Sequence, residues 1–364
     1  MLIILPTMNR ELYSYLKQKI DINLDDFYKD LSFKNVIADL FVSNICQLKC
    51  RHCYFGETQN IDNELTINEW TQTIDKLYQI GIRQFHFSGK ESSICKDTIP
   101  LIKYIKEKGA TSVGLVTNGL GKVEYYDNIF KEGIDYLEFS IDGDSISHNY
   151  IRNADAYSKV INCIHYLDKY CEKINITTCL NKLNHKTYFD MLEDIYSHFG
   201  ITKYFVTPLY IKGTACSIKN LSLTIQEYSS FIERSISFLQ QNPNKRLRLR
   251  FCVTEEFVEQ IWNNSPFLKK LIINSLDKGT NFIYPINGNV LQISFLFFNI
   301  DYITNISITN DGYIIPCADD ISNTLYNIIS LGNIRNMDSD TLFIKRKKHI
   351  INQISNLINI FNEL

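Results

Sequence analysis

Three of the ten cysteines stand within one short stretch of the chain, at Cys46, Cys50 and Cys53. A single loop can bring three thiolates at this spacing onto one metal centre. A closed tetrahedral zinc site or a fully ligated iron–sulfur cluster takes four protein ligands, so three cysteines leave one coordination position open. His52 is a poor fourth ligand, because it is wedged between two of the cysteines. The spacing therefore predicts a metal centre with room for a ligand from outside the protein.

The cysteine loop follows the first of six apolar, β-type runs, and helical patterns separate these runs. The predicted strands cover 36–42, 85–87, 113–116, 136–141, 174–180 and 204–209. The predicted helices between them cover 66–80, 97–108, 123–131, 156–170 and 186–199. This alternation predicts an α/β fold with a parallel sheet, and six strands suit an open, partial (β/α)6 barrel of the TIM type. In such barrels the chemistry takes place on the loops at the carboxyl ends of the strands.

Polar and glycine-containing segments also follow the next three strands. They are Ser88-Gly89-Lys90-Glu91, Thr117-Asn118-Gly119, and Ser140-Ile141-Asp142-Gly143 with Arg152 beyond it. Taken singly, Asn-Gly and Asp-Gly pairs mainly mark turns. Their order and their shared place at strand ends instead favour one binding site around the cysteine loop.

Together these features resemble the radical S-adenosylmethionine (SAM) enzymes. The cluster loop of that family, C-x3-C-x2-C followed by an aromatic residue, is matched by the segment from Cys46 to Tyr54. The resemblance covers about residues 36–215. It implies that Cys46, Cys50 and Cys53 hold one [4Fe-4S] cluster, whose open iron is chelated by SAM. Reductive cleavage of SAM then gives a 5'-deoxyadenosyl radical, which takes a hydrogen atom from the substrate.

The resemblance also implies which residues contact SAM. The expected contacts are Tyr54, Ser88, Gly89, Glu91, Thr117, Asn118, Ser140, Asp142 and Arg152. Glu91 matches the acid of the family's S-G-G-E motif, which holds the SAM ammonium, and Tyr54 is expected near the adenine. Lys90 departs from that motif, since the family usually has glycine there. Its side chain is expected to narrow the pocket or to reach into it.

The last part of the chain resembles the SPASM extension of peptide-modifying radical SAM enzymes. Residues 312–317, which end in Cys317, and 331–334 match its G-x4-C and G-N-I patterns. SPASM domains hold auxiliary iron–sulfur clusters, but no cysteine follows Cys317 here. We therefore expect an N-terminal helical segment 1–35, the radical SAM partial barrel 36–215, and a smaller, SPASM-like α+β extension 216–364 without auxiliary clusters.

Two cysteines of this extension, Cys216 and Cys317, are candidate catalytic residues. Either thiol can return a hydrogen atom to a substrate radical if it lies beside the substrate. A residual cluster on Cys216, Cys252 and Cys317 is an alternative, although these three share no ligand motif. The other scattered cysteines are expected to be small buried hydrophobic residues.

Composition excludes several classes of partner. The 364 residues carry 38 Lys and Arg against 40 Asp and Glu, which gives a net charge of −2 and an isoelectric point near 6.4. This balance argues against general binding to nucleic acid or to anionic membranes. No basic segment precedes the apolar start of the chain, and no apolar run approaches the ~18 residues of a membrane span. We expect a cytoplasmic protein.

The expected function is radical SAM maturation of a ribosomally synthesised precursor peptide, by a carbon–carbon cross-link of the cyclophane type. Loss of auxiliary clusters, a common electron sink in the family, tells against thioether chemistry more than against carbon–carbon bonds to an aromatic ring. A peptide epimerase with a cysteine hydrogen donor, a radical SAM enzyme for a small molecule, and a non-enzymatic metal-binding scaffold are the alternatives. The expected partners are the precursor peptide, an electron donor such as flavodoxin or ferredoxin, and a separate leader-binding protein, since only 35 residues precede the barrel.

Overall fold

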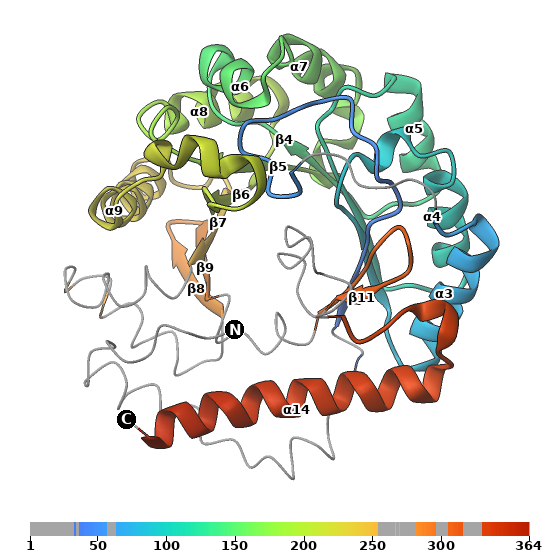
Figure 1. The fold of residues 1–364 in the computed structure, drawn as a ribbon. Coiled ribbons are helices and arrows are strands. Elements are labelled where there is room, and N and C mark those ends of the chain that lie inside the picture. The colour runs from blue at the N-terminus through green and yellow to red at the C-terminus, as the bar shows by residue number, and fades with distance from the viewer. Residues whose placement is uncertain are drawn as a thin grey trace.

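The structure is a computed structural model of the chain, drawn in Figure 1. It describes residues 36–56, 63–253, 281–295, 305–315 and 330–363, together with Phe33, Pro266 and Lys269. Cys317 and all but one residue of the predicted segment 1–35 lie outside the described residues.

The described strands form one continuous sheet. They are β1 Ile37–Leu40, β2 Gln84–Phe87, β3 Ser112–Thr117, β4 Tyr136–Ser140, β5 Ile174–Leu180, β6 Lys203–Pro208, β7 Arg248–Val253, β8 Asn281–Ile286, β9 Asn289–Phe295, β10 Ile306–Ile308 and β11 Ile314–Ile315. Their order in the sheet is β11-β10-β1-β2-β3-β4-β5-β6-β7-β9-β8. All neighbours from β10 to β9 are parallel, and antiparallel pairs occur only at the two edges.

Helices cover the outer face of this sheet. The described ones are α3 Ile67–Gln79, α4 Thr98–Glu107, α5 Val123–Lys131, α6 Ser145–Arg152, α7 Tyr157–Tyr166, α8 Tyr188–Phe199, α9 Ile225–Gln241 and α14 Ser339–Glu363, with short 3-10 helices at η3 Ser92–Ile94, η4 Asp168–Lys173, η5 Gly213–Leu221 and η7 Ile334–Asn336. Figure 1 shows α3 to α9 as an arc around the curved sheet, and α14 packs beside α3. None of the described helices combines the length and the hydropathy that a bilayer-spanning segment needs.

Helix α3 illustrates how the sequence sets these elements. Thr66 accepts a hydrogen bond from the backbone N–H of Glu69, whose side chain accepts one from the Thr66 backbone, so a capping box begins the helix. Trp70, Ile74 and Leu77 recur every three or four residues and are buried. This apolar stripe packs the helix on the sheet, and the opposite face stays in water.

The strands alternate between an apolar outer face and a polar inner face. Leu40 and Phe87 have no exposed surface, whereas their neighbours Asp39 and His86 line a cavity inside the sheet. The predicted α/β fold with a partial barrel is confirmed, because the six predicted strands are present as β1 to β6 in the predicted parallel arrangement.

The strands after residue 216 extend the same sheet at both of its ends. β7 pairs with β6, and β10 pairs with β1. Residues 254–280 lie outside the described residues, apart from Pro266 and Lys269. The division of the chain at residue 215 stays a prediction.

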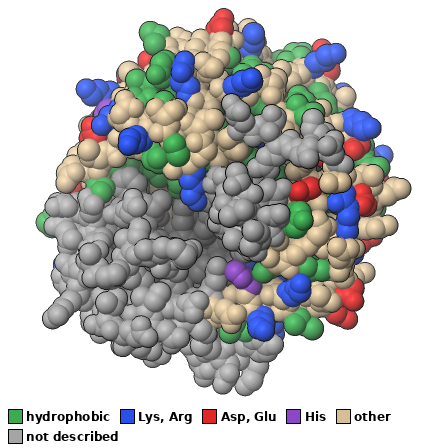
Figure 2. Space-filling model, in the orientation of Figure 1, with side chains coloured by type: hydrophobic (Ala, Val, Ile, Leu, Met, Phe, Trp, Pro, Cys, Tyr) green, Lys and Arg blue, Asp and Glu red, His purple; other side chains and the backbone are tan. Residues whose placement is uncertain are grey.

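The surface of the described part carries both signs of charge. On the face seen in Figure 2, Lys and Arg side chains are interspersed with Asp and Glu. This distribution agrees with the balanced net charge of the sequence.

Candidate active site

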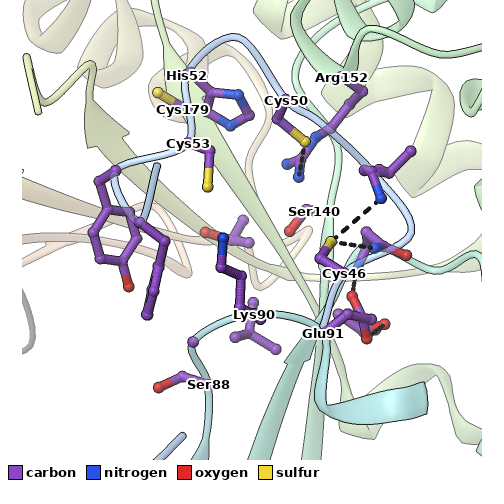
Figure 3. Close-up of a pocket in the computed structure, with 18 of the residues that line it drawn as sticks. Cys46, Cys50, His52, Cys53, Ser88, Lys90, Glu91, Ser140, Arg152 and Cys179 are labelled. Carbon is purple, nitrogen blue, oxygen red and sulfur yellow. Dashed lines mark hydrogen bonds between the residues drawn. The ribbon is translucent and has the colours of Figure 1, made fainter. Parts of the chain in front are cut away.

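A cavity of about 550 Å³ lies at the carboxyl ends of the parallel strands. The residues of the predicted site that line it, several of them drawn in Figure 3, are Cys46, Cys50, Cys53, Tyr54, Ser88, Gly89, Glu91, Thr117, Asn118, Ser140 and Arg152. The loops after four strands therefore meet at one space. Two predicted site residues, Asp142 and Cys216, are not part of its wall.

The cysteine loop is fixed on one side by the end of α6. The backbone N–H of Arg51 donates to the carbonyl of Ile151 at 2.8 Å. The guanidinium of Arg51 donates to the carbonyl of Tyr150 at 3.1 Å and to Oδ1 of Asn153 at 3.0 Å. These bonds tie the middle of the loop to the helix that also carries Arg152.

Thr214 and Gly213 hold the other side of the loop. The Thr214 hydroxyl lies 3.0 Å from the carbonyl oxygens of both Cys50 and Cys53. Gly213 has a φ of 56°, and a Cβ there would lie 2.5 Å from the Cys53 oxygen and 2.6 Å from that of Tyr54. Glycine is required at this position, because only glycine tolerates both the positive φ and the close approach.

Polar groups surround two of the cysteine sulfurs. Cys46 Sγ accepts from the Leu48 backbone N–H at 3.4 Å and from Asn118 Nδ2 at 3.7 Å, and a guanidinium nitrogen of Arg152 lies 4.0 Å from Cys50 Sγ. Burial raises the pKa of Cys46, and it raises the pKa of Cys50 to about 11 against the opposing charge of Arg152. N–H donors and a cation near sulfur favour the thiolate, which is the form that binds metal.

The three cysteine thiols are compatible with the ligand set of an iron–sulfur cluster. Within the described ranges, no group of three His, Cys, Asp or Glu side chains is placed to hold one metal ion. The three thiols instead stand around one cavity, and the thiolates of a cluster bind different irons. A cluster with one open iron is therefore compatible with this donor set.

Glu91 joins the motif after β2 to the motif after β3. Its side chain is 2% exposed; one oxygen accepts from Thr117 Oγ1 at 2.8 Å, and the other accepts from the Asn118 backbone N–H at 2.8 Å. Burial raises the pKa of Glu91, although these donors act in the opposite direction. Glu91 thus fixes the wall of the cavity in addition to lining it.

Asp142 lies behind the cavity wall, where it orients Arg152. Its carboxylate is fully buried and accepts from Arg152 Nε at 2.7 Å and from the Cys179 backbone N–H at 2.8 Å. His52 Nε2 lies 3.6 Å from the same carboxylate, and burial lowers the pKa of His52 to about 4. His52 is therefore neutral at pH 7 and faces Asp142 with this nitrogen. The structure places Asp142 as a support for the predicted site.

Polar side chains on the strands below the motif loops were not predicted from the sequence. Asp39, His86 and Glu138 line the cavity from β1, β2 and β4, and His86 Nδ1 is 3.0 Å from Asp39 Oδ1. Each is a charged or ionisable residue that stands between two apolar residues of its strand. Side chains alternate between the two faces of a strand, so an ionisable residue between two apolar ones was the available signal for a polar inner face.

The scattered cysteines take different places. Cys216 is exposed on η5, where its Sγ contacts the carbonyl of Ile211 at 3.7 Å, so the structure does not bring it to the cavity. Cys179, which we expected to be an ordinary buried residue, lines the cavity from the end of β5. Cys252 is buried, and Cys317 lies outside the described residues.

Comparison with known proteins gives a family match and distant relatives. Residues 40–195 match the model described as the Radical SAM superfamily. Fe-coproporphyrin III synthase of Methanosarcina barkeri is 30% identical over 189 residues, which are 50% of this chain and 46% of that protein. PqqA peptide cyclase of Bradyrhizobium diazoefficiens is 26% identical over 164 residues, 43% of this chain and 41% of that protein. The chain thus spans less than half the length of these two curated relatives.

Solved structures with a similar fold cover more of the chain. SuiB of Streptococcus suis, bound to the precursor peptide SuiA, has a TM-score of 0.66 at 15% identity and matches 92% of this chain and 69% of SuiB. The structure of anSMEcpe with bound AdoMet has a TM-score of 0.59 at 18% identity and matches 86% of this chain and 81% of that protein. At these identities the likeness is one of fold.

Proposed function

Because residues 40–195 of this chain are a radical SAM domain, we propose that the protein is an enzyme that removes a hydrogen atom from a precursor peptide. The convergence of the cysteine loop with the three motif loops on one cavity carries this proposal. Radical SAM proteins use a [4Fe-4S] cluster and SAM, which together supply the abstraction of a hydrogen atom from a C–H bond.

Different residues of the cavity hold the cluster and SAM. Cys46, Cys50 and Cys53 are the cluster ligands, and Asn118 and Arg152 place hydrogen-bond donors beside the sulfurs. The SAM contacts are the motif residues that line the cavity: Tyr54, Ser88, Gly89, Glu91, Thr117, Asn118, Ser140 and Arg152. Asp142 acts through Arg152, which it holds in place.

The proteins similar to this chain support a peptide substrate. SuiB was determined with a precursor peptide, and another relative is a peptide cyclase. The synthase of M. barkeri, named for a porphyrin, makes a small molecule the rival substrate class. A ribosomally made peptide is our preferred substrate, with an external one-electron donor and a separate leader-binding protein as partners.

We prefer a carbon–carbon cross-link as the product. Such a product needs no hydrogen donor from the protein. After the carbon–carbon bond has formed, the peptide would still have to pass one electron to a one-electron acceptor, which an oxidised iron–sulfur cluster or the external redox protein would supply, and one proton to water. Epimerisation is the second candidate, because the thiol of Cys179 lines the cavity. A thiol next to the substrate can return a hydrogen atom to the opposite face of a substrate radical, since its S–H bond is weak.

Iron analysis tests the cofactor assignment. The wild-type chain, reconstituted without oxygen, is expected to bind about four irons as one cluster. Replacement of Cys46, Cys50 and Cys53 together by Ala is expected to remove essentially all of that iron. A triple variant that keeps about four irons would place the cluster on other cysteines and contradict the proposal.

Mass spectrometry of the product tests the reaction. The chain is co-expressed with each short peptide encoded beside its gene, and the peptides are compared with and without the enzyme. A cross-link without added atoms makes the peptide about 2 Da lighter, whereas an epimer keeps its mass and gains about 1 Da per site in D2O when a thiol is the donor. An isobaric, deuterium-labelled product that disappears in Cys179→Ala would establish the epimerase instead. Conversion of a small molecule with no change in any peptide would contradict both peptide cross-linking and peptide epimerisation.

A further inference from the structure

Lys90 stands in the motif after β2 at the position where the similar family usually has glycine. Its side chain is half-buried and lines the cavity. Figure 3 shows it projecting from the loop after β2 into the space below Cys53. The side chain therefore enters the part of the cavity that the cysteine loop covers.

The ammonium group of Lys90 connects two loops of the cavity. Its Nζ donates to the carbonyl of Gly56 at 2.7 Å and lies 5.9 Å from the centre of the Phe55 ring. Gly56 stands three residues after the last cysteine, and its backbone N–H donates to the carbonyl of Cys53 at 3.3 Å. Lys90 thus holds the end of the cysteine loop against the loop after β2.

The charge of Lys90 has no carboxylate partner in the part of the chain that the structure describes. No acidic side chain there lies within ion-pair distance of its Nζ, and the adjacent Glu91 turns its carboxylate to Thr117 and Asn118. The other cations of the cavity wall differ from it. Arg152 is paired with Asp142, and Lys49 is exposed to water.

We propose that Lys90 is a positioning residue for the cluster, which fixes the end of the cysteine loop and places a positive charge, without a carboxylate partner among the described residues, beside its sulfurs. This inference rests on the proposed function. A positive charge in a partly buried cavity is screened less than one in water, so it stabilises the more negative, reduced state of a bound cluster. Lys90 therefore makes the reduction potential of the cluster less negative.

The experiment compares four variants of the reconstituted full-length chain with wild type. Lys90→Met removes both the charge and the hydrogen bond, Lys90→Gln can keep the bond without the charge, and Lys90→Arg keeps the charge. Lys49→Met is the matched control, because it removes an exposed positive charge from the same cavity wall. Iron and sulfide per chain, the rate of iron loss to a chelator, and the midpoint potential from a titration followed by electron paramagnetic resonance are measured for each.

We expect Lys90→Met and Lys90→Gln to shift the potential to more negative values, by more than Lys49→Met does, and Lys90→Arg to stay near wild type. Lys90→Met is also expected to lose iron several-fold faster than Lys90→Gln. If Lys90→Met binds no iron while its circular dichroism stays native, the loop-fixing role is supported and Lys90→Gln tests the charge. A wild-type potential in Lys90→Gln, or a shift no larger than that of Lys49→Met, would overturn this inference alone. A wild-type chain that binds no iron would overturn the proposed function as well.

Discussion

At the scale of single residues, the buried carboxylate of Asp142 organises the wall of the cavity. Burial raises the pKa of Asp142, but the charge of Arg152, the largest opposing influence, and the backbone N–H of Cys179 act against burial, and the net pKa lies below its usual value. The carboxylate therefore stays charged at neutral pH, and Arg152 supplies its direct counter-charge at 2.7 Å. Removing only one partner of such a buried ion pair leaves the other charge buried without a partner, which lowers the free energy of unfolding.

Removal of Arg152 alone should therefore destabilise the protein strongly. We expect Arg152→Met to lower the free energy of unfolding of the cofactor-free chain by about 3–5 kcal/mol, because a buried charge is left without a partner. The double variant Arg152→Met, Asp142→Asn should recover most of that loss, since no charge then remains. Urea unfolding of both variants and of Asp142→Asn measures the difference. Equal stability of the single Arg152 variant and the double variant would show that Asp142 does not need its partner.

The contribution of the His86–Asp39 pair to protein stability should depend on pH, and the direction of the pKa shift of His86 fixes its sign. Burial lowers its pKa, but the hydrogen bond and the charge of Asp39 raise it further, so the net pKa of His86 is raised. A raised folded-state pKa means that the pair stabilises the protein fully below the unfolded pKa near 6.5 and loses this contribution as pH rises through the folded pKa. The cost of Asp39→Asn should therefore be larger in mild acid than in mild base.

Denaturation at two pH values measures this difference. Hydrogen bonds to charged groups contribute more than neutral ones, so we expect the loss in Asp39→Asn to be about 1 kcal/mol greater at about pH 6 than at about pH 8. His86→Gln provides the control, because in that background Asp39→Asn should show no such difference. A cost that is the same at both pH values would mean that His86 does not titrate against Asp39.

At the scale of elements, the chain that leaves β6 holds the cysteine loop in place. We expect Gly213→Ala to lose about half or more of the bound iron, because a Cβ there would lie 2.5 Å from the Cys53 carbonyl and push the loop away. Gly200→Ala is the matched control. Its φ of 67° is also positive, but a Cβ there meets nothing within 4 Å, so it should cost about 1 kcal/mol of stability and leave the iron content unchanged. Equal iron in the two variants would contradict the role of Gly213.

The elements that sequence reasoning predicted are those with a strong periodic signal. β5 was predicted with the bounds that the structure gives, Ile174–Leu180, because its three aliphatic residues all stand at alternate positions of the seven-residue run. β7 was missed although Arg248 and Arg250 alternate with Leu249 and Phe251, since charged residues on an inward face mimic a surface segment. α6 was missed because its sequence is short and mostly polar, and its ends depend on the Asp144 cap and the left-handed Asn153.

The sequence predicted the loops of the candidate site but not the side chains on the strands beneath those loops. The cysteine loop and the motif loops could be placed because parallel strands bring their carboxyl ends to one edge. The distinction between Arg152 in the wall and Asp142 behind it depends on side-chain direction, which no motif encodes. Asp39, His86 and Glu138 needed the inward faces of three strands to be known together.

At the scale of the whole molecule, the sheet joins distant parts of the chain. The backbone N–H of Ile37 donates to Asn305 Oδ1 at 3.0 Å across 268 positions of sequence, and Ala38 pairs with Ile306. A chain ending at residue 304 should leave β1 as an open edge strand and therefore aggregate or lose its iron. Size-exclusion chromatography and iron analysis test this, and a monomeric truncated chain with normal iron would show that β10 does not support the cysteine loop.

The pairing of β1 with β10 also sets an order of events during biosynthesis. A ribosome makes β1 and the cysteine loop early, but the residues that complete the outer edge of β1 emerge only after some 268 further residues. Until then the strand that precedes the cysteine loop can pair with a neighbouring nascent chain, so this interval is the one in which chaperones matter most. We expect the metal to be inserted after release from the ribosome, into a chain whose two sheet ends have already been assembled.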